Sequence, residues 1–181
     1  MMSRRLALGL AATVAAVVLA ALLVSEPAPD PIRPGQPAPA FELPLLDGGT
    51  VALESLRGRI VLLNFWATWC KPCEDEMPAM QRLHGVLAGP DFELVAVSVD
   101  ASRDDIAKFR DRLGLTFPIA RDPDKRVSGA YQSHRFPESY LIDRDGTILS
   151  RYIGPRDWDA DLYVDRLRRV IEGAGAGAAP E

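Results

Sequence analysis

A seven-residue apolar run, Ile60–Trp66 (IVLLNFW), stands directly before a helical pattern that starts near Lys71 and ends near Leu87. An almost unbroken apolar run is typical of a strand buried on both faces, because strands with one solvated face alternate apolar and polar residues. Such a strand must lie inside a sheet that other elements cover on both sides. The run therefore predicts a layered α/β domain.

Strand and helix patterns alternate through the middle of the chain. Hairpin signals are found at 41–52 and 139–153, strand signals at 92–99 and 117–120, and helix signals at about 103–113, 127–132 and 159–172. Both hairpins are marked by turn residues, Asp47-Gly48-Gly49 in the first and Asp145-Gly146 in the second. This order predicts an α/β sandwich around a mixed β-sheet.

Charge and cysteine content narrow the function classes. The 181 residues carry a formal net charge of −4, and an acidic excess argues against a nucleic-acid partner, which needs a basic face. The two cysteines, Cys70 and Cys73, supply only half of a four-thiolate zinc site. Neither His84 nor His134 lies at metal-ligand spacing from them. The sequence thus predicts no metal site.

The amino terminus carries an export signal. Residues 6–24 contain no charge and only Thr13 as a polar side chain, and as a helix they would span roughly 28 Å, close to the thickness of a bilayer core. Arg4 and Arg5 precede the run and should stay cytoplasmic. This predicts a single transmembrane anchor with the rest of the chain on the extracytoplasmic (periplasmic) side. A cleaved signal peptide is the alternative, although the run is longer than a usual signal core.

The other boundaries follow from composition. Residues 1–5 form the expected cytoplasmic end, and residues 25–39, with six prolines, read as an extended linker. Residues 40–172 have the size of one domain with its own core. Residues 173–181 (GAGAGAAPE) have little to bury, and we expect them to be disordered.

The chemistry is concentrated in Trp69-Cys70-Lys71-Pro72-Cys73, which follows the buried strand and opens a helix. Free N–H groups and the positive end of the helix dipole favour a thiolate at Cys70. Lys71 adds a positive charge, and Pro72 suits an early helical position. The two-residue spacer lets Cys73 resolve a mixed disulfide on Cys70. These features predict a redox-active dithiol.

The sequence resembles the thioredoxin-fold family and, within it, the membrane-anchored TlpA/ResA-like thiol–disulfide oxidoreductases. The likeness covers about Gly35–Glu172 and rests on GQPAPAFEL, LRGRIVLLNFWATWCKPCEDEMP and FPESYLID. It implies a thioredoxin fold with an extra amino-terminal hairpin, a mixed sheet with helices on both faces, no cofactor, and exchange with protein clients. Peroxiredoxin activity is disfavoured, because a dithiol at a helix start replaces the lone peroxidatic cysteine of that family.

The resemblance also implies roles for single residues. Cys70 corresponds to the exposed nucleophile and Cys73 to the resolving thiol. Pro78 matches the proline that kinks the active-site helix, and Pro137 matches the proline that takes the cis form beside the dithiol, turning the Phe136 backbone toward an incoming peptide. Further neighbours of the cysteines are expected to shape the active site: Trp69, Lys71 and Pro72.

Two departures from ordinary thioredoxins, at positions 64 and 76, concern proton handling, and a third difference, at position 136, concerns substrate preference. Asn64 stands where thioredoxins carry a buried aspartate, and an amide cannot exchange a proton. Glu76 lies three residues after Cys73, on the same helical face, where TlpA/ResA-like proteins carry a glutamate serving the thiols. Partial burial would raise its pKa toward neutrality and suit proton exchange. Alternatively, Glu76 is only an acid favoured in a first helical turn. Phe136 replaces a smaller residue and leaves substrate preference open.

These residues predict an exported, membrane-tethered thiol–disulfide oxidoreductase. By resemblance, it would reduce specific clients, such as apocytochrome c before haem attachment, and be recharged by a membrane electron donor of thiol type. One alternative is a reductant in cytochrome oxidase copper-site assembly. Another is a Cu(I) chaperone that binds through Cys70 and Cys73, since thiolates select Cu(I). The sequence has no methionine- or histidine-rich tract near the two cysteines, and Pro72 between them favours a redox function over copper binding.

Overall fold

The computed structural model describes residues 9, 13, 14, 17 and 32–173. The chain divides into two units, residues 1–31 and 32–181, and the second contains the folded domain. Most of the expected anchor at 6–24, the first part of the expected linker and the tail after residue 173 lie outside the described residues. Among the residues that are described, no helix has the length and apolar character needed to cross a membrane.

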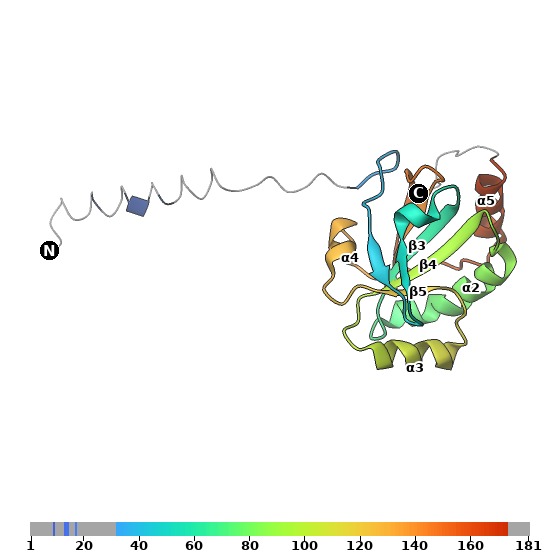
Figure 1. Cartoon of the computed structure of the whole chain (residues 1–181), viewed down its shortest axis with the longest axis horizontal. Coiled ribbons are helices and arrows are strands. Elements are labelled where there is room, and N and C mark those ends of the chain that lie inside the picture. The colour runs from blue at the N-terminus through green and yellow to red at the C-terminus, as the bar shows by residue number, and fades with distance from the viewer. Residues whose placement is uncertain (1–8, 10–12, 15–16, 18–31, 174–181) are drawn as a thin grey trace. The chain divides into compact units, whose positions relative to one another are not determined.

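Apart from one short 3-10 helix, which was not predicted from the sequence, the strands and helices of the domain follow the expected order (Figure 1). They are β1 (Glu42–Pro44), β2 (Thr50–Ala52), the 3-10 helix η1 (Leu53–Leu56), β3 (Ile60–Trp66), α2 (Lys71–Leu87), β4 (Phe92–Ser98), α3 (Arg103–Leu113), β5 (Ile119–Arg121), α4 (Arg126–Ala130), β6 (Glu138–Ile142), β7 (Ile148–Ile153) and α5 (Asp161–Ile171). The predicted bounds of β3 and α2 are confirmed, whereas α4 ends two residues earlier than predicted.

Local chemistry explains the ends of α3. The Ser102 hydroxyl accepts the Asp105 backbone N–H at 3.2 Å, which satisfies one of the free donors of the first turn. Gly114 ends the helix in the left-handed conformation, at φ 62°, which costs glycine little because it has no Cβ. The predicted start and end of this helix are therefore confirmed.

The main sheet has five strands in the order β5-β4-β3-β6-β7. β3 runs parallel to β4 and antiparallel to β6, so the sheet is mixed, while β1 and β2 form a separate hairpin. Because Phe65 near the end of β3 lies opposite Glu138 at the start of β6, the residues before β6 arrive beside the loop that follows β3. Glu138 also lies opposite Ile153, so the segment after β7 emerges at the same edge.

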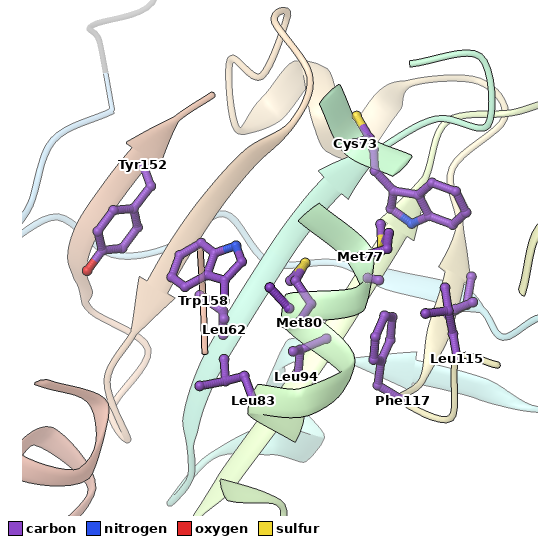
Figure 2. Close-up of a cluster of buried hydrophobic side chains, with 14 of the residues drawn as sticks. Leu62, Cys73, Met77, Met80, Leu83, Leu94, Leu115, Phe117, Tyr152 and Trp158 are labelled. Atoms are coloured by element: carbon purple, nitrogen blue, oxygen red, sulfur yellow. The ribbon is translucent and has the colours of Figure 1, made fainter. Parts of the chain in front are cut away.

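Each face of the sheet carries its own core. Side chains of α2, α3 and α5 cover one face, and the β1–β2 hairpin, η1 and Tyr131 after α4 cover the other. Figure 2 shows the first core, in which Met77, Met80 and Leu83 of α2 pack over the sheet, with Cys73 at one end of the cluster. The active-site helix is thus fixed to the sheet along its length by its apolar face.

Candidate active site

Cys70 and Cys73 are joined by a disulfide, with 5.3 Å between their Cα atoms. Cys70 is the N-cap of α2, and its sulfur accepts the Cys73 backbone N–H at 3.2 Å. This N–H and the positive end of the helix dipole both point at Cys70, a position that favours a thiolate over a thiol. The predicted position of the pair, after β3 and at the start of α2, is confirmed.

The exposure of Cys70 differs from the sequence expectation. Its residue surface is only 7% exposed, and that of Cys73 is fully buried. Cys70 is therefore the accessible member of the pair but not an exposed one, because its side chain turns back over the first turn of α2 as a helix cap.

Glu76, in the first turns of the dithiol helix α2, faces the interior, with only 3% of its surface exposed. Its Oε1 accepts the Asn64 side-chain N–H at 2.9 Å, and its Oε2 accepts the Arg156 backbone N–H at 3.0 Å and the Trp158 indole N–H at 3.2 Å. Three donors, one from β3 and two from the segment between β7 and α5, thus bind one carboxyl. An acid that merely favoured a first helical turn would point to solvent, so this geometry disfavours that alternative.

Burial raises the pKa of Glu76 from its ordinary value to about 7, because desolvation of the charged form outweighs the Arg156, Asn64 and Trp158 hydrogen bonds that favour it. A pocket of about 240 Å³ opens at Glu76 and is lined also by Asp75 and by Pro155, Arg156 and Asp157. A carboxyl that titrates near neutrality beside a pocket is suited to pass a proton between the interior and solvent.

Glu76→Gln is expected to change the pH dependence of stability. The raised pKa means that the folded state keeps a proton which the unfolded state has lost between about pH 4.5 and 7. The free energy of unfolding of the wild type should therefore fall as pH rises through this window, by about 3 kcal/mol in total. The glutamine variant should lack this fall. Urea unfolding of the oxidised protein across the window measures the difference, and parallel curves would show that Glu76 does not titrate there.

Phe136 and Pro137 reach the dithiol edge through strand pairing. Pro137 directly precedes β6, and the Phe136–Pro137 peptide bond is cis, as the resemblance implied. The Phe136 ring lies edge-on to Trp69, with 6.1 Å between ring centroids, and Trp69 is 67% exposed. The two rings form an apolar surface next to Cys70.

The remaining expected site residues lie on the first turns of α2. Lys71 is exposed and forms an ion pair with Asp75, one turn later, which raises the pKa of its ammonium group. Pro72 occupies an early helical position, where a missing N–H costs nothing. Pro78 lies inside α2 and cannot donate to the Glu74 carbonyl, as expected for the proline that interrupts this helix.

Sequence reasoning missed the residues that hold the active-site loop. Asp100 is buried two residues after the end of β4, and its carboxylate accepts the Thr68 N–H and hydroxyl, both at 2.8 Å, and the Ser98 hydroxyl at 2.7 Å. Because β3 and β4 are parallel, their carboxyl ends meet at one edge of the sheet. An acid just after the predicted strand 92–99 was therefore the signal in the sequence that could have indicated this contact. Trp158 and Ser139, which binds Asn64 at 2.9 Å, carried no such signal.

The sequence pattern of the AhpC/TSA family matches residues 34–151. ResA, a thiol–disulfide oxidoreductase, is 39% identical in Bacillus anthracis over 120 residues, which cover 66% of this chain and 69% of that protein. ResA of Oceanobacillus iheyensis is 39% identical over 162 residues, or 87% of this chain and 81% of that protein. The chain belongs to the AhpC/TSA family.

Solved structures agree with this membership. A Chlorobium tepidum protein, proposed to be the thiol:disulfide interchange protein DsbE, is similar with a TM-score of 0.68 and 34% identity over 81% of this chain and 99% of that one. A second thioredoxin-family interchange protein of Chlorobium tepidum gives a TM-score of 0.65 and 27% identity over 78% and 99%. The expected thioredoxin-like fold is confirmed, and this member of the AhpC/TSA family is a thiol–disulfide oxidoreductase.

Proposed function

We propose that the protein reduces disulfides of specific protein clients, with Cys70 as the nucleophile, Cys73 as the resolving thiol and Glu76 as the group that exchanges the proton. The observation that carries this proposal is the buried Glu76 carboxyl, held by three donors one helical turn after a dithiol at the start of α2. A disulfide that only stabilises the fold does not need a buried carboxyl group with a pKa near neutrality beside it.

The chemistry proceeds in two exchanges. The Cys70 thiolate attacks one sulfur of the client disulfide, forming a Cys70–client disulfide and releasing the other client sulfur as a thiolate. The Cys73 thiolate then attacks Cys70, forming the Cys70–Cys73 disulfide and releasing the second client sulfur. The client gains two electrons and two protons, and the protein loses them. A dithiol donor must restore the reduced pair.

Glu76 supports the second exchange because Cys73 is fully buried and must lose its proton there. The ionised carboxylate takes this proton and later releases it toward the adjoining pocket. Asn64 suits both states of Glu76. Its N–H donates to the carboxylate, whereas its buried Oδ1, which has no partner among the described residues, becomes available to a protonated carboxyl when the amide rotates.

The cellular setting belongs to the same proposal. The apolar run at 6–24 after Arg4 and Arg5 supports a single-pass anchor with the catalytic domain on the periplasmic side. The likeness to TlpA/ResA-like proteins supports clients of the apocytochrome c type, before haem attachment. A membrane donor of thiol type completes the cycle, since the oxidised pair needs two electrons from a dithiol.

Insulin reduction combined with metal analysis tests the reductase function against copper delivery. The purified full chain, kept reduced by dithiothreitol, should accelerate insulin reduction and contain no stoichiometric copper. Stoichiometric Cu(I) on Cys70 and Cys73 with no acceleration would favour a copper chaperone instead. Among the described residues, no group of three or more His, Cys, Asp or Glu side chains is placed to hold a metal ion, so copper would have to rest on the two thiolates.

A further inference from the structure

A second pocket lies beside Phe136, next to the dithiol site. Its volume is about 210 Å³, and it is lined by Lys125, Ser128, Gly129, Ser133, His134 and Phe136. Phe136 contacts Trp69, which in turn adjoins Cys70 in the chain. The aromatic pair therefore connects the nucleophile with this pocket, and a peptide that crosses the two rings reaches both.

The rim of the pocket is basic. Lys125 and His134 line it, and each is followed directly by an exposed arginine, Arg126 and Arg135. Within residues 32–173, the side chains of Lys125, Arg126 and Arg135 form no ion pair or hydrogen bond, whereas Lys71 close to the dithiol is neutralised by an acid. The positive charge at the pocket is thus available to bind an acidic group of another molecule.

The neighbouring acids do not cancel this charge. Asp122 is buried, and its carboxylate accepts the backbone N–H groups of Val127 at 3.2 Å and Ser128 at 2.8 Å, so it is used in holding α4. Asp124 is exposed and makes no ion pair with Lys125 within the described part of the chain. Within residues 122–135, the stretch that supplies most of the pocket lining, one exposed acid therefore stands against three exposed cations and His134.

Two details indicate that the pocket is more than a surface irregularity. Lys125 has φ 56°, a left-handed backbone conformation that favours glycine. The backbone conformation therefore gives no reason for a lysine at this position. Ser133 is buried, and its hydroxyl has no partner among the residues that the structure describes. An ammonium group and a hydroxyl donor without an acceptor are the groups that a carboxylate uses.

We propose that this pocket binds an acidic side chain of the client polypeptide, near in sequence to the cysteine that Cys70 attacks. The inference rests on the proposed function, because the client is the protein whose disulfide Cys70 reduces. Lys125 supplies the charge, Ser133 the additional donor, and the Trp69–Phe136 rings support the residues between the acid and the cysteine. Clients with an acidic residue flanking the cysteine are therefore preferred over clients with a basic one.

The test compares three synthetic peptides, each with one intramolecular disulfide, that differ only in having Glu, Gln or Lys beside the cysteines. The reduced full chain should give a kcat/KM about fivefold higher for the Glu peptide than for the Lys peptide at low salt, and high salt should reduce the ratio. Lys125→Glu should reverse the preference. Lys108→Glu, an exposed residue of α3 with the same charge change, should keep it.

The outcomes separate the subsite from the function. If the wild type reduces all three peptides at equal rates, the function stands and the acidic subsite is wrong. If Lys108→Glu changes the preference as much as Lys125→Glu does, net charge and not the pocket selects the client. If the wild type reduces none of the peptides or insulin, the proposed function itself fails. Reversal confined to Lys125→Glu supports the subsite.

Discussion

Cys70→Ala is expected to abolish disulfide reduction, whereas Cys73→Ala is expected to stop after the first exchange. Without Cys70 no accessible thiolate remains, because Cys73 is fully buried. Without Cys73 the client stays bound to Cys70, since nothing attacks the mixed disulfide from within the protein. Both variants should turn over insulin at the uncatalysed rate. Intact-mass measurement should find a protein–client adduct with Cys73→Ala only.

This prediction depends on an asymmetry between the two sulfurs that the fold creates. Cys70 caps α2 and keeps 7% of its surface exposed, whereas Cys73 is fully buried at one end of the core cluster (Figure 2). The Cys70→Ala/Cys73→Ala double variant is the control and should form no adduct. Normal insulin turnover by Cys73→Ala, or an adduct formed by Cys70→Ala, would contradict the assignment of roles.

Glu76→Gln is expected to slow turnover about tenfold near pH 7. Burial raises the pKa of Glu76 to about 7, so the carboxyl exists in both its ionised and its protonated form near neutrality and can both take the proton of Cys73 and release it. The amide can do neither. The difference should fade at alkaline pH, where hydroxide takes the proton directly. The pH–rate profile of client reduction measures both parts of the expectation.

Glu74→Gln is the matched control for that profile, because it removes the same charge from the same turn of α2. Glu74 forms an ion pair with Arg112 at 2.7 Å and serves no buried hydrogen-bond network. Its substitution should leave the profile close to that of the wild type. A tenfold slowing in both variants would mean that the rate of client reduction depends on the total charge of this helical turn and not on the buried carboxyl of Glu76.

The elements of the fold were predictable from the sequence because their signals are local. The apolar run of β3, the dithiol and the periodic stripe of α2 lie next to one another in the chain, and their bounds agree with the structure. The extra hairpin was marked by its glycine turn, and the structure gives both glycines a positive φ. Each of these signals needs only a few neighbouring residues to be read.

The surroundings of the site were not predictable, because they depend on strand register and on segments far apart in the chain. Asn64 meets Ser139 only because β3 and β6 pair in one particular register. Trp158 reaches Glu76 across 82 positions. The spacing of Glu76 from Cys73 indicated that the two residues share a helix face. It did not indicate how deeply the Glu76 side chain is buried, because that depends on β7 and the segment after it.

The pH titration of Cys70 alkylation tests most directly whether the ionisation of Glu76 is coupled to that of the dithiol. An ionised Glu76 opposes a nearby thiolate, so Glu76→Gln should move the midpoint of alkylation of the reduced protein to lower pH, by about one unit. Glu74→Gln should move it less. Superimposable curves for the wild type and Glu76→Gln would contradict the proposed role and leave Glu76 as a buried acid that only supports the fold.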